Sequence, residues 1–286
     1  MLAAAASTPT VVRAGLIGRG IGASRTPAMH MAEGKAQGLD YAYAFFDMDQ
    51  RTDTLASVVS EAERNGFAGL NVTFPYKVDI IELLDELSDT ARALGAVNTV
   101  VLRHGKRYGH NTDLWGFAES FRRNMVGAPT DAVLLIGAGG AGVAVAHALL
   151  TLAVKTLWIH DIDAARAGKL TAQLVARFGP GRAGVTDSMA AVAPHLSGVV
   201  NATPVGMAKL PGCPLPKELL RPDLWVADIV YFPLETELLA AARATGCRVL
   251  PGSGMAVFQA VRSFELFTGL TPDPARMRAT FAAFDR

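Results

Sequence analysis

The chain has 286 residues, which is more than one typical domain holds, so we expect two domains. Half of the residues are hydrophobic and 19% are charged, a composition that can bury large cores. The formal charge is +1, and the acids and bases are scattered rather than gathered in a basic stripe or polybasic run. No apolar stretch has the length and purity of a membrane span. These features exclude nucleic-acid-binding and membrane proteins.

The alanine-rich N-terminal segment lacks the charged and long apolar regions of a secretory signal, so we expect a loose tail before the first strand. Cys213 and Cys247 lie far apart, and reduced thiols in a cytoplasmic protein are the simplest account of them. His30, His110 and His160 share no metal-ligand spacing, and neither cysteine has a partner histidine. We therefore expect no metal.

Strands and helices alternate through the first 113 residues, which predicts an α/β domain. The expected strands cover residues 11–18, 41–47, the first part of 67–77, 95–101 and 108–113. The expected helices cover residues 28–37, 54–65 and 78–87, with a helical continuation over 85–93 and a further helix from Leu114.

Two hydroxyl side chains, Ser24 and Thr26, follow the first strand in a loop rich in glycine. Pro27 suits the first position of a helix, so Thr26 is the expected N-cap, and capping alone could explain it. Ser24 has no such expected duty. Two hydroxyls beside a helix start also favour a carboxylate ligand, and the two interpretations are evenly matched.

Lys77 and Asp113 are the charged candidates of this part of the chain. Both are expected at strand ends that lead into helices, on the side where open α/β sheets bind ligands. A cation at a helix start is disfavoured by the helix dipole, which points to a functional lysine, with a solvent-facing side chain as the alternative. Asp113 could serve only as an N-terminal helix acid.

Residues 133–161 carry the strongest pattern, an apolar run, a glycine turn, an alanine-rich helix and a second apolar run. Gly137, Gly139 and Gly142 fit G-x-G-x-x-G, which allows a tight turn and lets a pyrophosphate approach the helix start. Because both flanking strands and a terminal acid are present, we predict a dinucleotide site. The alternative is a small-residue helix packed on a sheet with nothing bound.

Asp161, at the tip of the second strand, can accept hydrogen bonds from ribose hydroxyls and repels a 2′-phosphate. No arginine follows directly, and Arg166 is expected to be solvated or paired with Asp163. The sequence therefore predicts NAD, with NADP less favoured. The chain continues with expected helices at 164–178, 237–245, 256–267 and 273–284, a Gly/Pro linker after 178, and strands at 198–202, 225–230 and 248–250.

Taken together, eight motifs in family order resemble the shikimate/quinate dehydrogenase family. They are the Ser24-x-Thr26-Pro27 loop, N-V-T-x-P-x-K (71–77), G-A-x-N-T (95–99), G-x-N-T-D (109–113), G-A-G-G-A (137–141), N-A-T-P-x-G-M (201–207), D-x-x-Y-x-P (228–233) and G-M-x-x-x-Q-A (254–260). The resemblance implies an α/β fold with a substrate domain (1–114), a Rossmann doubly wound NAD-binding domain (115–253) and C-terminal helices (254–286) that return to the substrate domain.

The resemblance also implies roles for single residues. The catalytic pair would be Lys77 and Asp113. The substrate-binding residues would be Ser24, Thr26, Thr73, Asn98, Tyr231 and Gln259. The cofactor-binding residues would be Gly137, Ala138, Gly139, Gly140, Ala141, Asp161, Thr203, Gly252 and Met255. For Tyr231 and Met255, the residue types and positions alone favour core packing over ligand binding.

Two departures separate this chain from the biosynthetic enzymes of the family, which make aromatic amino acid precursors. Thr26 stands where those enzymes usually have serine, and Asp161-Ile162-Asp163 stands where NADP-dependent members usually have Asn-Arg-Thr/Ser. Both resemble the NAD-dependent quinate/shikimate dehydrogenases of quinate catabolism. The methyl group of Thr26 can reshape the pocket around C1 of the acid, and we expect it to tolerate the C1 hydroxyl of quinate.

The implied reaction is oxidation of a ring secondary alcohol to a ketone, in which a hydride leaves to the nicotinamide and a proton leaves to a base. We assign Asp113 mainly to orienting the hydroxyl and Lys77 to proton exchange, and which of them formally takes the proton stays open. Alternatives are an aminoshikimate-type dehydrogenase, a non-catalytic quinate/shikimate sensor, and a folate-linked methylene dehydrogenase, which does not account for the carboxylate loop. The partner is a small hydroxy-acid, and the protein is expected to be a monomer or a homodimer.

Overall fold

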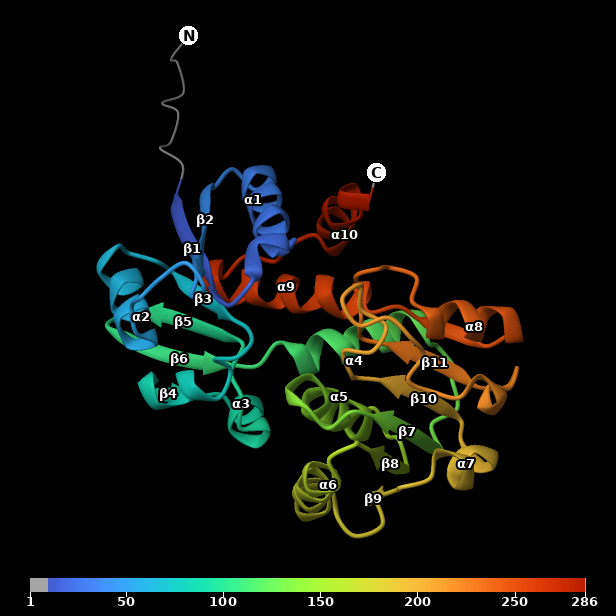
Figure 1. Cartoon of the computed structure of the whole chain (residues 1–286). Helices are drawn as coiled ribbons and strands as arrows, with labels where there is room; N and C mark the ends of the chain where they lie inside the picture. The colour runs from blue at the N-terminus through green and yellow to red at the C-terminus, as the bar shows by residue number, and fades with distance from the viewer. Residues whose placement is uncertain (1–9, 286) are drawn as a thin grey trace. The chain divides into compact units, whose positions relative to one another are not determined.

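The computed structural model describes residues 10–285, and the predicted N-terminal tail lies outside this range. The described chain divides into two compact units (Figure 1). One contains the residues up to Thr112 together with those from Ala260 on, and the other contains Asp113–Gln259. Within the described residues, no helix is long and apolar enough to cross a membrane.

The first unit is built on a six-stranded mixed sheet in the order β2-β1-β3-β5-β6-β4. Its strands are β1 (Val11–Gly18), β2 (Asp40–Asp47), β3 (Gly69–Val72), β4 (Glu86–Leu87), β5 (Thr99–Arg103) and β6 (Lys106–His110). β1 runs parallel to both β2 and β3, whereas β5 is antiparallel to β3 and β6. In this register Leu16 pairs with Phe45 on one side and Asn71 on the other. The carboxyl ends of β1 and β3 therefore meet at one edge, next to the start of β5.

Helices cover both faces of this sheet. They are η1 (Ile21–Ala23), α1 (Thr26–Ala36), α2 (Leu55–Arg64), η2 (Asp79–Leu83), α3 (Asp89–Leu94), α10 (Pro274–Ala282), η5 (Ala283–Asp285) and the last part of α9 (Ser253–Thr268). On one face, Ile17 packs with Val58 of α2 and Ile80 of η2. On the other face, Ala14 packs with Phe264 of α9. Ile17 and Ala14 both lie on β1, so this central strand is buried on both faces of the sheet, as its apolar sequence requires.

The second unit is an all-parallel six-stranded sheet in the order β12-β11-β10-β7-β8-β9. Its strands are β7 (Ala132–Ile136), β8 (Thr156–His160), β9 (Ala183–Val185), β10 (Gly198–Asn201), β11 (Trp225–Asp228) and β12 (Arg248–Leu250). Counted from β7, this is the 3-2-1-4-5-6 order of the Rossmann fold. The predicted doubly wound fold is therefore confirmed.

The helices of the second unit divide between the two faces of its sheet. They are α4 (Asp113–Asn124), α5 (Gly140–Thr151), α6 (Ala164–Phe178), α7 (Met189–Val192), η3 (Ala193–His195), η4 (Lys217–Leu219) and α8 (Glu237–Thr245), with the first part of α9. α4, α5 and α6 enclose one core with Val133 and Leu157. Leu196, Leu220 and Leu238 form the other core with Leu134.

Two stretches differ from the sequence-based expectation. The predicted helix over 78–87 with its continuation over 85–93 is interrupted. The chain forms the short helix η2, then the two-residue strand β4, and starts α3 at Asp89. The cause is tertiary pairing, since the N–H of Ser88 donates to Gly109 O on β6 and the Ser88 hydroxyl caps α3. The predicted linker after α6 contains β9, where Gly184 leaves room for the Trp158 ring, 2.8 Å from a Cβ placed there.

The division into units also differs slightly from the predicted domain limits. The first division follows Thr112 rather than residue 114, and the second follows Gln259 rather than residue 253. The reason is that α9 begins at Ser253 and continues without a break to Thr268, so the chain has no boundary at residue 253. Residues 254–259 group with the Rossmann unit.

Candidate active site

The carboxyl ends of β1 and β3 are held close together by a glycine. A Cβ at Gly18 would lie 2.4 Å from Thr73 Cγ2, so only glycine lets the Thr73 side chain sit against the end of β1. The N–H of Thr73 donates to Ile17 O at 2.9 Å, and the N–H of Arg19 donates to Phe74 O at 3.1 Å. The loop that carries the predicted carboxylate ligands therefore begins beside Thr73.

The start of α1 differs from the expectation for Thr26. The helix begins at Thr26, and its N-cap residue is Arg25, so the prediction of Thr26 as N-cap is wrong. The hydroxyl of Ser24, which had no expected structural duty, accepts the N–H of Thr26 at 3.4 Å. Ser24 therefore helps to close the helix start, and the half-buried Thr26 hydroxyl is not needed for capping.

Helix α1 is fastened at both ends to α10. The buried guanidinium of Arg25 donates to Phe281 O at 3.0 Å and lies 4.6 Å from the centre of the Phe281 ring. At the other end, Arg276 pairs at 2.8 Å with Glu33, whose side chain is fully buried. The same carboxylate accepts the N–H of Asp273 at 3.0 Å. These contacts fix the position of the Ser24–Thr26 loop relative to the sheet of its unit.

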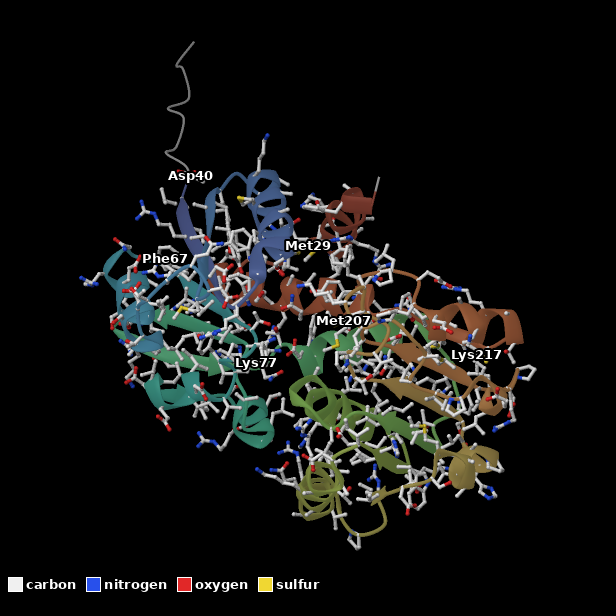
Figure 2. The ribbon with its side chains drawn as sticks, in the orientation of Figure 1. Met29, Asp40, Phe67, Lys77, Met207 and Lys217 are labelled. Carbon is white, nitrogen blue, oxygen red and sulfur yellow. The ribbon has the colours of Figure 1, made fainter. Side chains whose placement is uncertain are left out.

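Lys77 lies in the turn that follows β3 (Figure 2). Its backbone oxygen accepts the N–H of Val97 at 2.8 Å, which ties the turn to the residue before Asn98. The five-residue helix η2 begins at Asp79, so Lys77 does not occupy an α-helix start and the helix-dipole argument for it is wrong. The half-buried side chain is placed by the strand end and the turn.

Asn98 is a buried residue directly before β5, with 4% of its surface exposed. Its side-chain oxygen accepts the backbone N–H of Thr112 at 2.8 Å, and its nitrogen donates to the Thr112 hydroxyl at 3.0 Å. Asp113 follows directly in the chain and begins α4. Asp113 is also buried, with 8% of its surface exposed. Asn98 thus fixes the strand end from which Asp113 emerges.

The glycine turn of the second unit has the geometry that the sequence predicted. Gly137 adopts a φ of 100°, which a residue with a side chain rarely adopts. A Cβ at Gly142 would lie 2.1 Å from Gly137 O, so glycine is required for the close packing of α5 on β7. A Cβ at Gly139 would meet nothing within 4 Å, which leaves open space at the helix start. These are the three duties of glycine in a dinucleotide turn.

Asp161 is held against this turn by both of its carboxylate oxygens. One accepts the backbone N–H of Ala138 at 2.7 Å, and the other accepts that of Asp163 at 2.9 Å. Each oxygen keeps acceptor capacity for a further donor. Arg166 lies 3.6 Å from the carboxylate of Asp163, which confirms the predicted pairing. The tip of β8 therefore carries acidic side chains.

Thr203 lies beside the glycine turn, since its methyl carbon would be 2.9 Å from a Cβ at Gly137. Its hydroxyl donates to the side-chain oxygen of the fully buried Asn201 at 2.7 Å. The nitrogen of Asn201 donates to Asp228 at 2.9 Å, and burial raises the pKa of that carboxyl although hydrogen bonds from Thr236, Val230 and Asn201 oppose the shift. This buried network sets the shape of the loop after β10.

The remaining predicted residues of the second unit differ in how far they are buried and in what they contact. Gly252 allows a close backbone approach, because a Cβ there would lie 2.4 Å from Ile229 O. Met255 is buried in the core shared by α4, α5 and α6, as its packing alternative predicts. Tyr231 is 41% exposed after β11, and Gln259 donates to Ala256 O at 3.1 Å on α9. Their roles toward ligands stay predictions.

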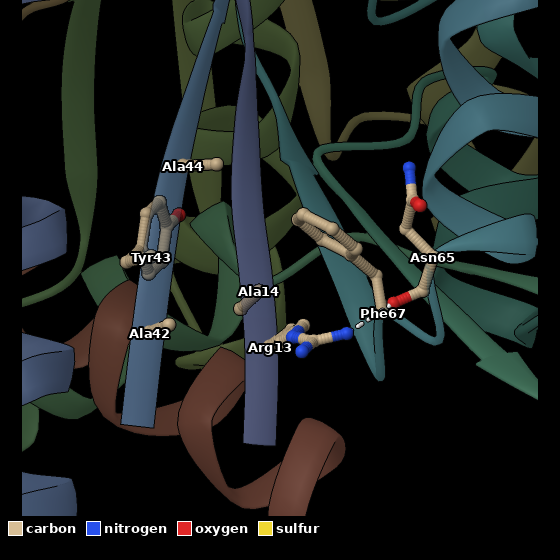
Figure 3. A pocket seen from close by; sticks show the side chains of 7 residues that line it. All are labelled: Arg13, Ala14, Ala42, Tyr43, Ala44, Asn65 and Phe67. Atoms are coloured by element: carbon tan, nitrogen blue, oxygen red, sulfur yellow. Dashed lines mark hydrogen bonds between the residues drawn. The ribbon is translucent and has the colours of Figure 1, made fainter. Parts of the chain in front are cut away.

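Two hollows of the described chain are lined by residues other than the predicted catalytic pair. A hollow of about 360 Å³ lies along β1 and β2 and is lined by Arg13, Ala14, Ala42, Tyr43, Ala44, Asn65 and Phe67 (Figure 3). A second, of about 570 Å³, lies by His160, Ser188 and Cys213. Among residues 10–285, no group of three or more His, Cys, Asp or Glu side chains is arranged to hold a metal.

Sequence reasoning missed the polar residues that support Asn98. Asn71 and Thr99 lie within the N-V-T and G-A-x-N-T motifs, and both are buried. Asn71 donates to the Thr99 hydroxyl at 3.1 Å across the β3–β5 pair. An asparagine inside an otherwise apolar strand is a signal for such a network, because a buried amide requires partners.

Models of known protein families match two parts of the chain. The shikimate dehydrogenase substrate binding domain matches residues 16–100. The shikimate 5′-dehydrogenase C-terminal domain matches residues 252–280. The two matches include the carboxylate loop, the Lys77 turn and Gln259.

Curated relatives match nearly the whole chain. A shikimate dehydrogenase (NADP(+)) of Streptomyces avermitilis is 51% identical over 94% of this chain and 94% of its own length. A quinate/shikimate dehydrogenase (NAD(+)) of Corynebacterium efficiens is 47% identical over 93% of this chain and 96% of its own length. Among solved structures, quinate dehydrogenase from Corynebacterium glutamicum in complex with NAD is similar with a TM-score of 0.92 and 45% identity, covering 96% of this chain and 99% of that one.

Proposed function

The chain belongs to the shikimate/quinate dehydrogenase family of NAD(P)-dependent oxidoreductases acting on a CH–OH group, and we propose that it oxidises quinate and shikimate with NAD. The observation that carries the cofactor assignment is Asp161. Its carboxylate is fixed by two backbone amides at the tip of β8, next to the glycine turn. In that position it accepts hydrogen bonds from the ribose hydroxyls of NAD and repels the 2′-phosphate of NADP.

The relatives support both cofactors, because the Streptomyces avermitilis enzyme is named for NADP and the Corynebacterium efficiens enzyme for NAD. The negative charge of Asp161 at the end of β8 favours NAD. Arg166, the nearest following arginine in the sequence, pairs with Asp163, which also accepts the N–H of Arg166 as the N-cap of α6. This arginine is therefore engaged in the helix start.

The residues of the glycine turn and the β8 tip would hold the nucleotide, and the bound nicotinamide supplies the hydride acceptor. The Ser24 and Thr26 hydroxyls would bind the carboxylate of the acid. Asp113 would accept a hydrogen bond from the reacting hydroxyl and orient it. Lys77 would exchange its proton at Nζ. These residue roles follow from the family motifs and from the strand ends that carry them.

Exchange of Asp161 for asparagine is expected to shift the cofactor preference. Asp161→Asn keeps an acceptor for Ala138 N but removes the negative charge, so kcat/KM for NAD should fall about tenfold and that for NADP should rise. Asp163→Asn is the matched control, because it removes a nearby charge while keeping the cap of α6. Steady-state rates with each cofactor measure both variants. An unchanged NAD/NADP ratio in Asp161→Asn would contradict the assignment.

The substrate assignment predicts that the purified protein oxidises both quinate and shikimate with NAD. The methyl group of Thr26 is expected to leave room for the C1 hydroxyl of quinate. Steady-state oxidation of quinate, shikimate and aminoshikimate with each cofactor is the test. Oxidation of shikimate with quinate untouched would overturn the role of Thr26, and turnover of aminoshikimate alone would replace the substrate class. Binding of an acid without NAD reduction would identify a sensor.

A further inference from the structure

Tyr43 on the edge strand β2 reaches across β1 to the next strand of the sheet. Its hydroxyl lies 2.7 Å from the side-chain oxygen of Asn71 on β3. On the intervening strand the residue paired with Tyr43 is Ala14, which is fully buried (Figure 3). The small side chain of Ala14 leaves room for the tyrosine ring to pass over β1. His30 packs edge-on against that ring, with the ring centres 5.2 Å apart.

The contact continues from Asn71 to Asn98 as a hydrogen-bond relay of Tyr43, Asn71, Thr99 and Asn98. The nitrogen of Asn71 lies 3.1 Å from the Thr99 hydroxyl, and that hydroxyl lies 3.0 Å from the side-chain oxygen of Asn98. Asn71 and Asn98 are 4% exposed and Thr99 is fully buried. Water therefore competes little with these bonds, and each group depends on its protein partners.

The direction of the relay is set at its Asn98 end. A backbone N–H can only donate, and that of Thr112 is 2.8 Å from the Asn98 atom in question, so this atom is the carboxamide oxygen. Thr99 then donates its one proton to that oxygen and accepts from the nitrogen of Asn71. The oxygen of Asn71 is left to accept from Tyr43. Every bond in the series then has one donor and one acceptor.

Tyr43 can keep the donor role that this direction requires. Burial raises the pKa of the Tyr43 hydroxyl well above its usual value, and the nearby Tyr41 acts in the same direction. The hydroxyl therefore stays protonated at neutral pH. The Tyr43 hydroxyl can therefore always donate its hydrogen bond to the side-chain oxygen of Asn71.

The relay leaves the side-chain nitrogen of Asn98 as the atom that can bind a ligand. The side-chain oxygen of Asn98 accepts the N–H of Thr112 and the hydroxyl of Thr99, and the Thr112 hydroxyl lies 3.2 Å from it as a further donor. Its nitrogen has two hydrogens and uses one for the Thr112 hydroxyl at 3.0 Å. Among residues 10–285, the second hydrogen meets no further acceptor and is available to a ligand oxygen. Rotation of the amide by half a turn would place a nitrogen against two donors, which the buried site disfavours.

We propose that Tyr43 is a positioning residue of the hydroxy-acid site, which acts through Asn71 and Thr99 to hold Asn98 as a hydrogen-bond donor toward the substrate. The inference rests on the proposed role of Asn98 in binding the acid. The group that Asn98 recognises is then an oxygen acceptor on the ring. A hydroxyl oxygen and a ketone oxygen both accept, so the same contact serves the alcohol and its oxidation product.

Two phenylalanine variants on the same strand test this role. Tyr43→Phe removes the hydroxyl that starts the relay, whereas Tyr41→Phe removes a buried hydroxyl that bonds to His30 at 2.9 Å instead. Tyr43→Phe is expected to raise KM for quinate or shikimate about five- to tenfold, the factor that one hydrogen bond of ordinary strength gives. kcat and KM for NAD should stay within about twofold, since binding of the acid alone is weakened. Tyr41→Phe should leave KM for the acid unchanged.

A second pair of variants at Thr99 tests the middle of the relay, also for the case that Tyr43→Phe does not fold. Thr99→Val breaks the relay and should raise KM for the acid by a similar factor, and Thr99→Ser, which keeps the hydroxyl, should restore most of that loss. Tyr43→Phe combined with Thr99→Val should resemble Thr99→Val alone, because both act through one series.

The outcomes separate this inference from the proposed function. An active wild type in which Tyr43→Phe and Tyr41→Phe change KM for the acid equally overturns the inference alone. So does a Thr99→Ser variant with the same KM for the acid as Thr99→Val. A wild type that oxidises neither acid overturns the proposed function and this inference with it.

Discussion

Replacement of Lys77 by methionine is expected to lower kcat by about 100-fold or more, the usual contribution of a group that exchanges a proton in the transition state. Lys77 is half-buried in the turn after β3, and its backbone bond from Val97 does not depend on the side chain. Methionine has a similar length, so the turn should keep its form. The loss should therefore appear in kcat, with little change in the melting temperature.

Two further substitutions give this prediction its controls. Lys77→Arg keeps a positive charge but cannot release a proton near neutral pH, so it should be nearly as slow as Lys77→Met. Lys106→Met removes an exposed lysine that pairs with Glu86 at 2.8 Å, and it should leave kcat unchanged. Wild-type turnover in Lys77→Arg would show that only the charge of Lys77 matters. A Lys77→Met enzyme within threefold of wild type would contradict the role altogether.

Replacement of Asp113 by asparagine is expected to lower kcat by about 100-fold, because it removes the carboxylate that we propose to orient the reacting hydroxyl. The change is nearly isosteric, and Asn98 still binds the preceding residue, Thr112, by its backbone. The N-terminal position on α4 gives the carboxylate a second effect, a favourable interaction with the helix dipole of about 0.3–1 kcal/mol. Its loss should lower the melting temperature only slightly.

Asp89 is the matched control for that second effect. It occupies the first position of α3, as Asp113 does on α4, but it is exposed and has no predicted role toward substrate. Asp89→Asn should reproduce any small loss of stability without any loss of kcat. If Asp113→Asn behaved like Asp89→Asn, with a small stability change and near wild-type turnover, Asp113 would be a helix-start acid and no more.

The elements with strong local signals could be predicted from the sequence. α6 was expected at 164–178 and α8 at 237–245, and both have these limits. In each, a side chain caps the first turn, Asp163 in α6 and Thr236 in α8. Gly246 adopts the left-handed conformation that ends α8. Caps, periodicity and a terminal glycine agree there, so local chemistry is enough to set the element.

The stretch from Val78 to Leu94 could not be predicted in this way. Its apolar spacing is compatible with a helix, but β4 exists only because it pairs with β6, which follows about twenty residues later in the chain. The three-residue strand β9 depends in the same way on β8. Short elements of this kind are set by tertiary partners, and a local pattern does not contain them.

For the site, the sequence predicted the glycine turn and the acid beside it, because tight turns and helix starts impose their own residue types. It misjudged the start of α1, where Ser24 rather than Thr26 has the local structural duty. It also missed the relay from Tyr43 to Asn98, whose members on β2, β3 and β5 are far apart in sequence. Hydrogen-bond partners across a sheet follow from register, which becomes visible only in the folded chain.

The central claim, that Asp161 makes this chain an NAD-linked dehydrogenase of a ring hydroxy-acid, has one direct test. It is the ratio of kcat/KM for NAD to kcat/KM for NADP, measured on the unmodified protein with quinate and with shikimate. The fixed carboxylate at the tip of β8 predicts a ratio of at least about ten, since a 2′-phosphate would be placed beside a negative charge. Equal efficiencies with the two cofactors, or a preference for NADP, would contradict it.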